Sequence, residues 1–257
     1  MAENLNIVDF FTLFGPHPSK GAMTPSGTGP LLTAMGHHSV SSAVTLSTRA
    51  VYFDAAEGNR ETKQAVTESG GKLIPAALLD PRRPNPERTG GGARVLVLLP
   101  GMQRYPLPYT PLTELLRTLA QLGGAAAAAI PIWWETSRPG DATAVLQTLR
   151  ETNYPAPILL GGVSGDNLME ALAVAKVLPD RIHVATNGLR GIGEVGQAVA
   201  ALGAEKVIFA SGAPNRSLGA ALAFISQAAL SPEDRALVLG GNARRLFGAR
   251  AESGAAV

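Results

Sequence analysis

Short, almost entirely apolar segments recur along the chain, with polar or helix-forming segments between them. Segments that are apolar at successive positions, rather than at every second one, are typical of parallel strands buried on both faces. Eight such segments are present. The predicted strands are Ile7–Thr12, Ser42–Thr48, Lys72–Asp80, Arg94–Pro100, Ala125–Trp133, Pro157–Ser164, Arg181–Asn187 and Glu205–Ser211.

Signals for the start of a helix occur between these strands. Thr110 stands before a proline and a series of leucines at helical spacing, and Asp141, Asp166 and Ser231 each precede a further helical pattern. Two connections differ from the rest. Residues 81–92 are rich in Pro, Gly and Arg and are expected to hold little helix, and residues 16–29 form a predicted loop after the first strand.

Eight strands joined by helical crossovers predict an α/β fold of the (β/α)8 type, a TIM barrel, as a single domain over residues 1–257. The length is close to the roughly 250 residues typical of this fold, and no linker divides the chain. The alternative is an open doubly wound sheet, which usually has fewer strands. In a barrel, active sites lie at the carboxyl ends of the strands, so the residues at those ends are the candidates for function.

Composition and charge exclude other classes of protein. With 46% hydrophobic and 16% charged residues, the chain has the composition of a folded domain. The net charge of +2, without runs of Lys or Arg, gives no sign of nucleic acid or of an anionic membrane as a partner. The chain has no cysteine and only four histidines, so thiolate chemistry is excluded and imidazole chemistry is limited.

The sequence carries no targeting signal that we recognise. The first residues lack the pattern of a secretory signal. The longest apolar run, residues 123–134, is shorter than the about 20 residues that span a bilayer. We therefore expect a cytoplasmic protein.

Four groups of residues resemble, in order along the chain, the pattern of one family of barrel proteins. They are Ile7–Gly15, Gly58–Glu61 with Leu79–Pro81, Val207–Pro214 and Gly241–Gly248. The chain resembles the amidohydrolase-related (amidohydrolase-2) family of metal-dependent TIM-barrel hydrolases and decarboxylases. The resemblance spans the whole chain and implies the same barrel fold.

The positions that carry metal ligands in this family are replaced here. The family's first strand ends Asp-x-His-x-His, and Phe11 and Leu13 stand at the two His positions. Gly162 stands at the sixth-strand His, Gly212 at the eighth-strand Asp, and no His lies near Pro131, the fifth-strand position. Zinc or manganese needs three or more converging nitrogen or oxygen ligands. The resemblance therefore implies a barrel without the family's metal, and we expect no cofactor.

Three residues are candidates for acid–base chemistry. Glu135 follows two tryptophans at the end of the fifth strand, where indoles raise a carboxyl pKa, but it equally suits a cap for the loop that follows. Asp9 shares the inward face of the first strand and acts either as a buried acid or as an acceptor for neighbouring donors. His17, on the loop after that strand, is the histidine best placed to reach a substrate. His183 lies within a predicted strand and is interpreted as a structural residue.

The candidates for substrate binding are mostly arginines at strand ends. Guanidinium groups bind carboxylate or phosphate with two hydrogen bonds, although Arg outnumbers Lys 17 to 5 and is common throughout the chain. The loops 188–193 and 212–217 also offer backbone N–H groups to an anion, or simply begin helices. The predicted binding residues are Arg49, Arg104, Trp133, Trp134, Asn187, Arg190 and Arg216.

Two functions remain open at this point. The first is a metal-independent hydrolase, lyase or isomerase that acts on a small carboxylated or lactone-type substrate, since related barrels include lactonases that work without metal. The second is a non-catalytic barrel that binds a metabolite, or an inactive partner subunit of a related metal-dependent hydrolase. Either protein binds a small molecule, and a homo-oligomer or a pairing with a related barrel is compatible with both.

Overall fold

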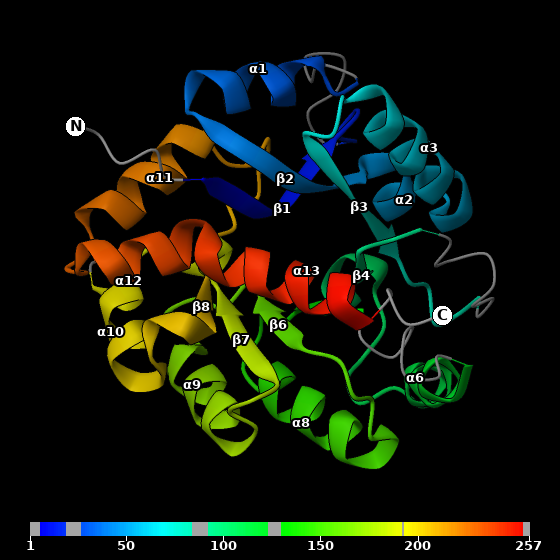
Figure 1. Ribbon diagram of the computed structural model, residues 1–257. Coiled ribbons are helices and arrows are strands. Elements are labelled where there is room, and N and C mark those ends of the chain that lie inside the picture. The colour runs from blue at the N-terminus through cyan, green and yellow to red at the C-terminus, as the bar shows by residue number, and fades with distance from the viewer. Residues whose placement is uncertain (1–5, 19–26, 84–91, 123–129, 192, 254–257) are drawn as a thin grey trace.

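Eight parallel strands form a single sheet in the computed structural model, which describes residues 6–18, 27–83, 92–122, 130–191 and 193–253 (Figure 1). The strands are neighbours in chain order from the first to the eighth. They are β1 (Ile7–Phe14), β2 (Val40–Ser47), β3 (Leu73–Leu78), β4 (Val95–Leu98), β5 (Ile132–Glu135), β6 (Ile158–Gly161), β7 (Ile182–Ala185) and β8 (Val207–Ile208).

Backbone hydrogen bonds between β1 and the segment that follows β8 close the sheet. Phe10 N–H donates to the carbonyl of Phe209 at 3.0 Å, and Leu13 N–H donates to that of Ala213 at 2.7 Å. In return, Gly212 N–H donates to the carbonyl of Phe11 at 3.0 Å. The predicted (β/α)8 barrel is therefore confirmed.

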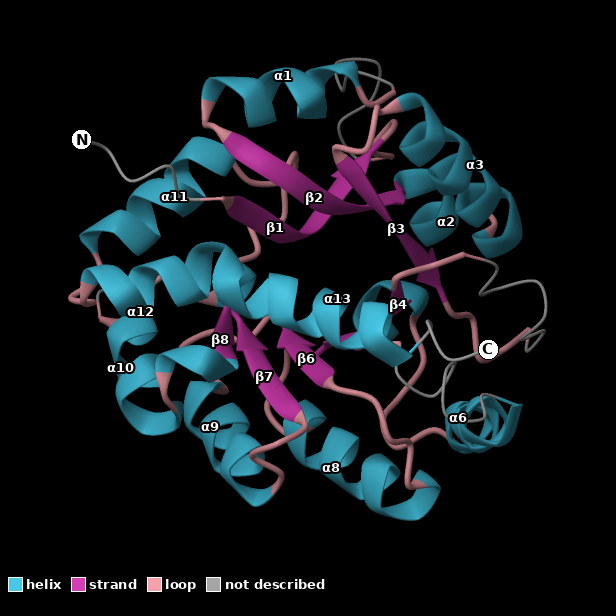
Figure 2. Cartoon of the chain, viewed as in Figure 1, coloured by secondary structure: helices cyan, strands magenta, loops and turns pink. Residues whose placement is uncertain are grey.

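Helices surround the strands (Figure 2). They are α1 (Gly29–His37), α2 (Thr48–Tyr52), α3 (Ala55–Glu68), α5 (Pro100–Gln103), α6 (Thr110–Leu122), α8 (Asp141–Thr152), α9 (Leu168–Val177), η2 (Thr186–Gly188), α10 (Glu194–Leu202), η3 (Ala204–Lys206), α11 (Leu218–Gln227), α12 (Pro232–Ala236), η4 (Leu237–Gly241) and α13 (Asn242–Ser253). None of the described helices is long and apolar enough to cross a membrane.

The side chains of each strand point alternately into the barrel and out towards the helices, and this divides the buried core into two sets. One set of buried side chains fills the barrel, as Leu46, Val97 and Leu159 do. The other set, including Leu160 and Trp134, packs between the strands and the helices. This division follows from the two-residue period of a strand, which turns successive side chains to opposite faces.

Helix α13 crosses the amino-terminal end of the barrel, in the middle of the view in Figure 1. Arg94, just before β4, donates from Nη2 to the carbonyl of Phe247 at 3.2 Å. Asn242 donates from Nδ2 to the carbonyls of Ala204 and Val207, each at 2.7 Å. The helix closes this end and leaves the carboxyl ends of the strands for a site.

The sequence-based elements agree with the structure apart from their ends. All eight predicted strands are present, and Ser231 caps α12 by accepting from Asp234 N–H at 3.0 Å. Residues 205 and 206, predicted as strand, form η3 instead, where the chain turns into β8. Parts of four predictions lie outside the described residues: 125–129 of the fifth strand, 84–91 of the third crossover, 19–26 of the first loop and 192 of the loop 188–193.

Candidate active site

A cavity of about 600 Å³ opens at the carboxyl ends of the strands. Its apolar part consists of Phe11 and Leu13 from β1, Leu99 after β4 and Trp133 from β5. Polar and small residues of the segments after β5, β6, β7 and β8 complete its wall. The cavity thus lies where barrel enzymes carry their active sites, and its volume is typical of a small-molecule site.

Stacked rings form the apolar floor. The rings of Phe11 and Trp133 lie nearly parallel, 4.3 Å apart between centroids and 6° from coplanar. Gly161, on the neighbouring strand, makes room for the indole, because a Cβ at this glycine would lie 2.2 Å from Trp133 Cζ2. The two rings pack face to face as one apolar unit, and Trp133 is almost fully buried within it.

Glu135 is the carboxyl group next to this floor. Burial raises its pKa above the ordinary glutamate value, and the negative charge of Asp141 adds to the rise. The amides of Gly101 and Met102 offset part of it, yet no hydrogen bond of normal geometry reaches the buried Oε2 from the described residues. A buried carboxyl with a raised pKa and a free oxygen is suited to proton transfer.

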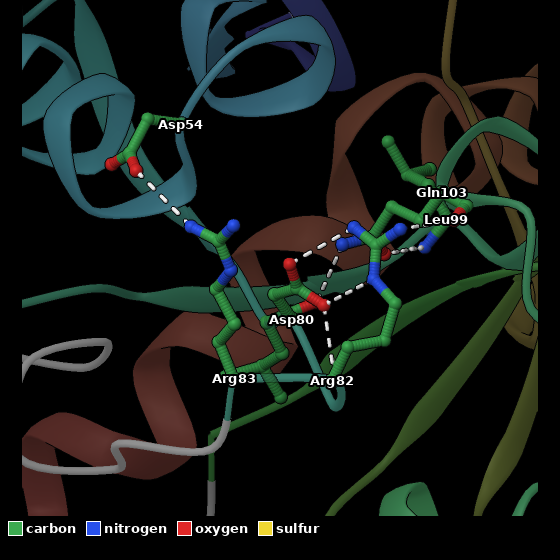
Figure 3. A network of polar contacts seen from close by, with 7 residues as sticks. Asp54, Asp80, Arg82, Arg83, Leu99 and Gln103 are labelled. Carbon is green, nitrogen blue, oxygen red and sulfur yellow. Dashed lines mark hydrogen bonds and ion pairs between the residues drawn. The ribbon is translucent and has the colours of Figure 1, made fainter.

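A polar network joins the end of β3 to Gln103 of α5 (Figure 3). Arg82 forms an ion pair with Asp80 through Nε at 2.8 Å and Nη2 at 2.9 Å. Its Nη1 donates to the carbonyl of Gln103 at 2.7 Å, and Gln103 Nε2 donates to the carbonyl of Leu79 at 3.1 Å. These contacts place Gly101 so that a Cβ there would lie 3.2 Å from Glu135 Oε2.

The loops after β7 and β8 contribute the cationic side of the cavity. Asn187, Arg190 and Arg216 all line it. Asn187 Oδ1 accepts from Gly162 N–H at 2.9 Å, and Arg216 Nη1 donates to the Asn187 carbonyl. Within the described chain neither arginine forms an ion pair, so no carboxylate neutralises either guanidinium charge there.

Several of the described backbone N–H groups that were expected to bind an anion after β7 and β8 already have acceptors within the protein. Arg190 N–H and Gly191 N–H donate to Glu194 Oε2 at 2.6 and 2.8 Å. After β8, Gly212 N–H donates to Phe11 and Ala213 N–H donates to Ser211 Oγ. Binding of an anion here depends on the arginine side chains.

Of the predicted site residues, Glu135, Trp133, Asn187, Arg190 and Arg216 line this one cavity. The sequence-based prediction omitted Met102, Ser137 and Asn215, which line it as well. Each follows a strand end closely in sequence, which is the signal that points to them.

Asp9 and His17 lie outside the lining. Asp9 is fully buried and accepts hydrogen bonds from Ser211 O–H at 2.5 Å, Ser211 N–H at 2.9 Å and Phe11 N–H at 3.3 Å. It therefore joins β1 to the segment after β8. A hydrogen bond of 2.9 Å joins His17 Nε2 to the Tyr52 hydroxyl, whose pKa is raised by burial and by the charge of Glu135.

Three predicted binding residues point elsewhere. Arg49 forms ion pairs with Glu57 at 3.5 Å and Glu61 at 3.3 Å. Trp134 is buried on the outer face of β5. Arg104 is exposed, in a left-handed backbone conformation at the end of α5. None of the three borders the cavity.

The side chains around the cavity do not fit a resident zinc or manganese ion. Phe11, Leu13, Gly162 and Gly212, which the sequence resemblance pairs with ligand positions of the family, line the cavity, and none of them has a donor side chain. Across the described residues, no three His, Asp or Glu side chains lie close enough together to hold a metal ion. Transition metals require such a set.

The fold and this cavity define the chain as a (β/α)8 barrel with a ligand-sized site at the carboxyl ends of its strands. Residues 92–249 match the sequence pattern of the Amidohydrolase family (Amidohydro_2), and the chain belongs to that family. The resemblance seen in the sequence is confirmed. None of the curated protein sequences compared with the chain matches it.

Solved structures of similar fold cover nearly the whole chain. The 5-carboxyvanillate decarboxylase of Sphingomonas paucimobilis is 14% identical over 95% of this chain and 99% of its own, with a TM-score of 0.70. A dihydroxybenzoic acid decarboxylase from Polaromonas, with bound manganese and 2-nitroresorcinol, is 14% identical over 95% and 97%, with a TM-score of 0.70. A probable 2-pyrone-4,6-dicarboxylic acid hydrolase from Acinetobacter baumannii, with citric acid bound, is 16% identical over 95% and 99%, with a TM-score of 0.66.

Proposed function

We propose that this chain is a metal-independent enzyme, a lyase, hydrolase or isomerase, that acts on a small planar carboxylate, either an aromatic acid or a lactone. One observation carries the proposal. A buried carboxyl with a raised pKa, a stacked aromatic floor and two arginines without ion-pair partners line one cavity of about 600 Å³. These groups suffice to bind a flat anion and to move a proton on it.

The parts have separate roles in this proposal. Arg190 and Arg216 bind the carboxylate of the substrate, because guanidinium groups match its geometry. Phe11 and Trp133 hold the ring by stacking and exclude water around it. Glu135 gives or takes the proton at the reacting atom, and burial keeps more of it protonated near neutral pH than an exposed glutamate.

The substrates of structural relatives agree with this choice. The decarboxylases are named for carboxylated phenols, and the hydrolase is named for a dicarboxylated pyrone. The relatives thus act on flat rings that bear carboxylates. The absence of donors at the family's ligand positions supports chemistry that uses Glu135 and the arginines in place of a metal.

The second candidate is a non-catalytic barrel that binds such a ligand. The observation that favours it is the apolar part of the cavity lining, which includes Phe11 and Leu13, since an apolar lining suits binding without chemistry. In this reading Glu135 only lines the cavity.

A thermal-stabilisation screen tests the binding that both candidates require. The chelator-treated protein is heated with benzoates, hydroxybenzoates, pyrone carboxylates and lactones, each beside its neutral amide or ester. A carboxylate at about 100 times its dissociation constant adds roughly 2.7 kcal/mol to the free energy of unfolding. At about 2–4 °C per kcal/mol for a chain of this size, the shift is easily read.

Alanine variants of the two arginines locate the binding site, and an assay for turnover then tests the proposal. Arg190→Ala and Arg216→Ala should each lose the shift, whereas Arg150→Ala, on the exposed face of α8, should keep it. Every acid that binds is then incubated with the protein and followed for release of CO2 or opening of the ring. Turnover supports the enzyme. Binding without turnover favours the non-catalytic barrel, and the absence of any shift from planar carboxylates rejects both.

A further inference from the structure

A second cavity, of about 270 Å³, lies beside the candidate active site. It lies between the end of β1, helix α1 and the start of α11. Its inner wall is apolar and buried, and consists of Leu13, Phe14, Leu31, Ala213 and Leu218. We refer to this space as the side cavity.

The two cavities share two residues. Leu13 and Arg216 line both of them. The guanidinium of Arg216 reaches the carbonyl of Asn187, which lies on the active-site side. Leu13 and Arg216 thus form the boundary between the two cavities, and a carboxylate held by Arg216 would lie at this boundary.

The outer rim of the side cavity depends on the fit between α1 and α11. His38, which follows α1, lies against Gly219 in the first turn of α11, and a Cβ at this glycine would be 2.6 Å from His38 Cε1. Both residues line the side cavity, and His38 is exposed. The space therefore has a buried apolar end near Leu13 and an open end at the imidazole.

We propose that the side cavity binds an apolar substituent of the ligand whose carboxylate lies at Arg216, and so selects for substituted rings. The proposal rests on the proposed function, because it assumes a ring carboxylate in the main cavity. Because the wall of the side cavity is apolar, the substituent that suits it is an alkyl chain. An alkyl chain gains about 0.8 kcal/mol for each buried methylene, which is about a fourfold gain in affinity.

Calorimetric titration with alkyl benzoates tests this inference. Benzoate and its 3- and 4-substituted ethyl, propyl and butyl derivatives are titrated into the protein. We expect one positional series to bind about fourfold more tightly with each methylene until the space is full. A dissociation constant that does not change with chain length in either series would overturn the proposal.

A second experiment uses variants that fill the side cavity. Ala34→Leu places a larger side chain in it from α1, and Leu31→Phe does so from the neighbouring turn. Both variants should bind benzoate with an unchanged dissociation constant. Both should lose the gain in affinity that the alkyl substituent gives. Ala173→Leu, on the exposed face of α9, is the matched control and should keep both. An unchanged chain-length gain in both filled variants would contradict the inference.

Titration with n-hexanol separates this inference from the proposed function. If no benzoate binds, the proposed function fails, and the side cavity is then judged by n-hexanol alone. Binding to the wild-type protein that is lost in Ala34→Leu shows an apolar site there. Binding that is absent, or equal in the two proteins, refutes the side cavity independently of the carboxylate.

Discussion

Asp9 is a buried carboxyl that holds the seam of the barrel, and its titration makes the stability of the protein depend on pH. Burial raises its pKa from 3.8 to about 6, against the lowering effect of its hydrogen bonds with Ser211. The folded state thus holds the proton more tightly than the unfolded chain. The contribution to stability is complete below about pH 4 and is lost as the pH rises through about 6.

Asp9→Asn should remove this dependence. Between pH 4.5 and 7.5 the free energy of unfolding of the wild-type protein should fall by about 2 kcal/mol relative to that of the variant. Urea unfolding at several pH values measures the difference. Asp180→Asn, which replaces an exposed carboxyl, should follow the wild type. A constant difference between Asp9→Asn and wild type would show that Asp9 titrates normally.

Glu135→Gln should separate binding from chemistry. The amide keeps the size of the side chain but cannot act as an acid or a base near neutral pH, so turnover should fall at least 100-fold, within the about 10²–10⁴-fold range of general acid–base catalysis. Thermal stabilisation by the ligand should remain. Steady-state kinetics and the thermal shift measure the two quantities on one preparation. Turnover that persists in the variant would remove Glu135 from the mechanism.

Side-chain direction decides which strand-end residues reach the cavity. Trp133 and Trp134 are neighbours in sequence, yet the first lines the cavity and the second packs behind the barrel. The period of a strand predicts that one of them points inward. Arg49 could not be excluded in this way, because its partners Glu57 and Glu61 come from α3 and their pairing is set only by the fold.

At the scale of the elements, β5 and β6 hold the aromatic floor together through a close contact at Gly161. Gly161→Ala would place a Cβ 2.2 Å from the Trp133 indole, so the ring must move away from Phe11. Overpacking of this kind costs about 1–3 kcal/mol. We expect that loss in urea unfolding, together with altered fluorescence, since the chain has only two tryptophans.

Gly196→Ala is the matched control for this prediction. Nothing lies within 4 Å of the position of its Cβ, and the residue is inside α10. Alanine is favoured over glycine by roughly 0.5–1 kcal/mol in a helix, so this variant should be slightly more stable than the wild type. Equal stability of the two variants would mean that the contact at Gly161 relaxes without cost.

The elements themselves were predictable because each carries its own signal. Apolar runs predicted all eight strands, and the start signals at Thr110, Asp141, Asp166 and Ser231 fall within two residues of the first residues of α6, α8, α9 and α12. What local pattern does not contain is the contact between elements. Gly58 allows α3 to lie on α2, since a Cβ there would be 1.9 Å from Ala50 N. Asn59 bonds to both backbone groups of Leu78. The resemblance marked both residues, and the structure gives the reason.

In the whole molecule, one end of the barrel contributes stability and the other carries the cavity. At the amino-terminal end, α13 is fixed by Asn242 and Arg94, so that end contributes stability. At the other end, close contacts at glycines and the network around Arg82 shape a cavity. This arrangement is common to the fold, and the chemistry depends on which side chains the open end carries.

Among the described residues that end carries no set of metal ligands, so we expect that added metal does not stabilise the protein. Dialysis against a chelator, and then addition of Mn²⁺ or Zn²⁺, should leave the melting temperature unchanged. A metal at about 100 times its dissociation constant would add roughly 2.7 kcal/mol, or about 5–11 °C.

The triple variant Phe11→His, Leu13→His, Gly212→Asp restores three donors at positions that face the cavity. It should gain a metal-dependent shift that the parent lacks. A shift of that size in the parent itself would mean that other side chains bind the ion, and the metal-free mechanism would have to be abandoned.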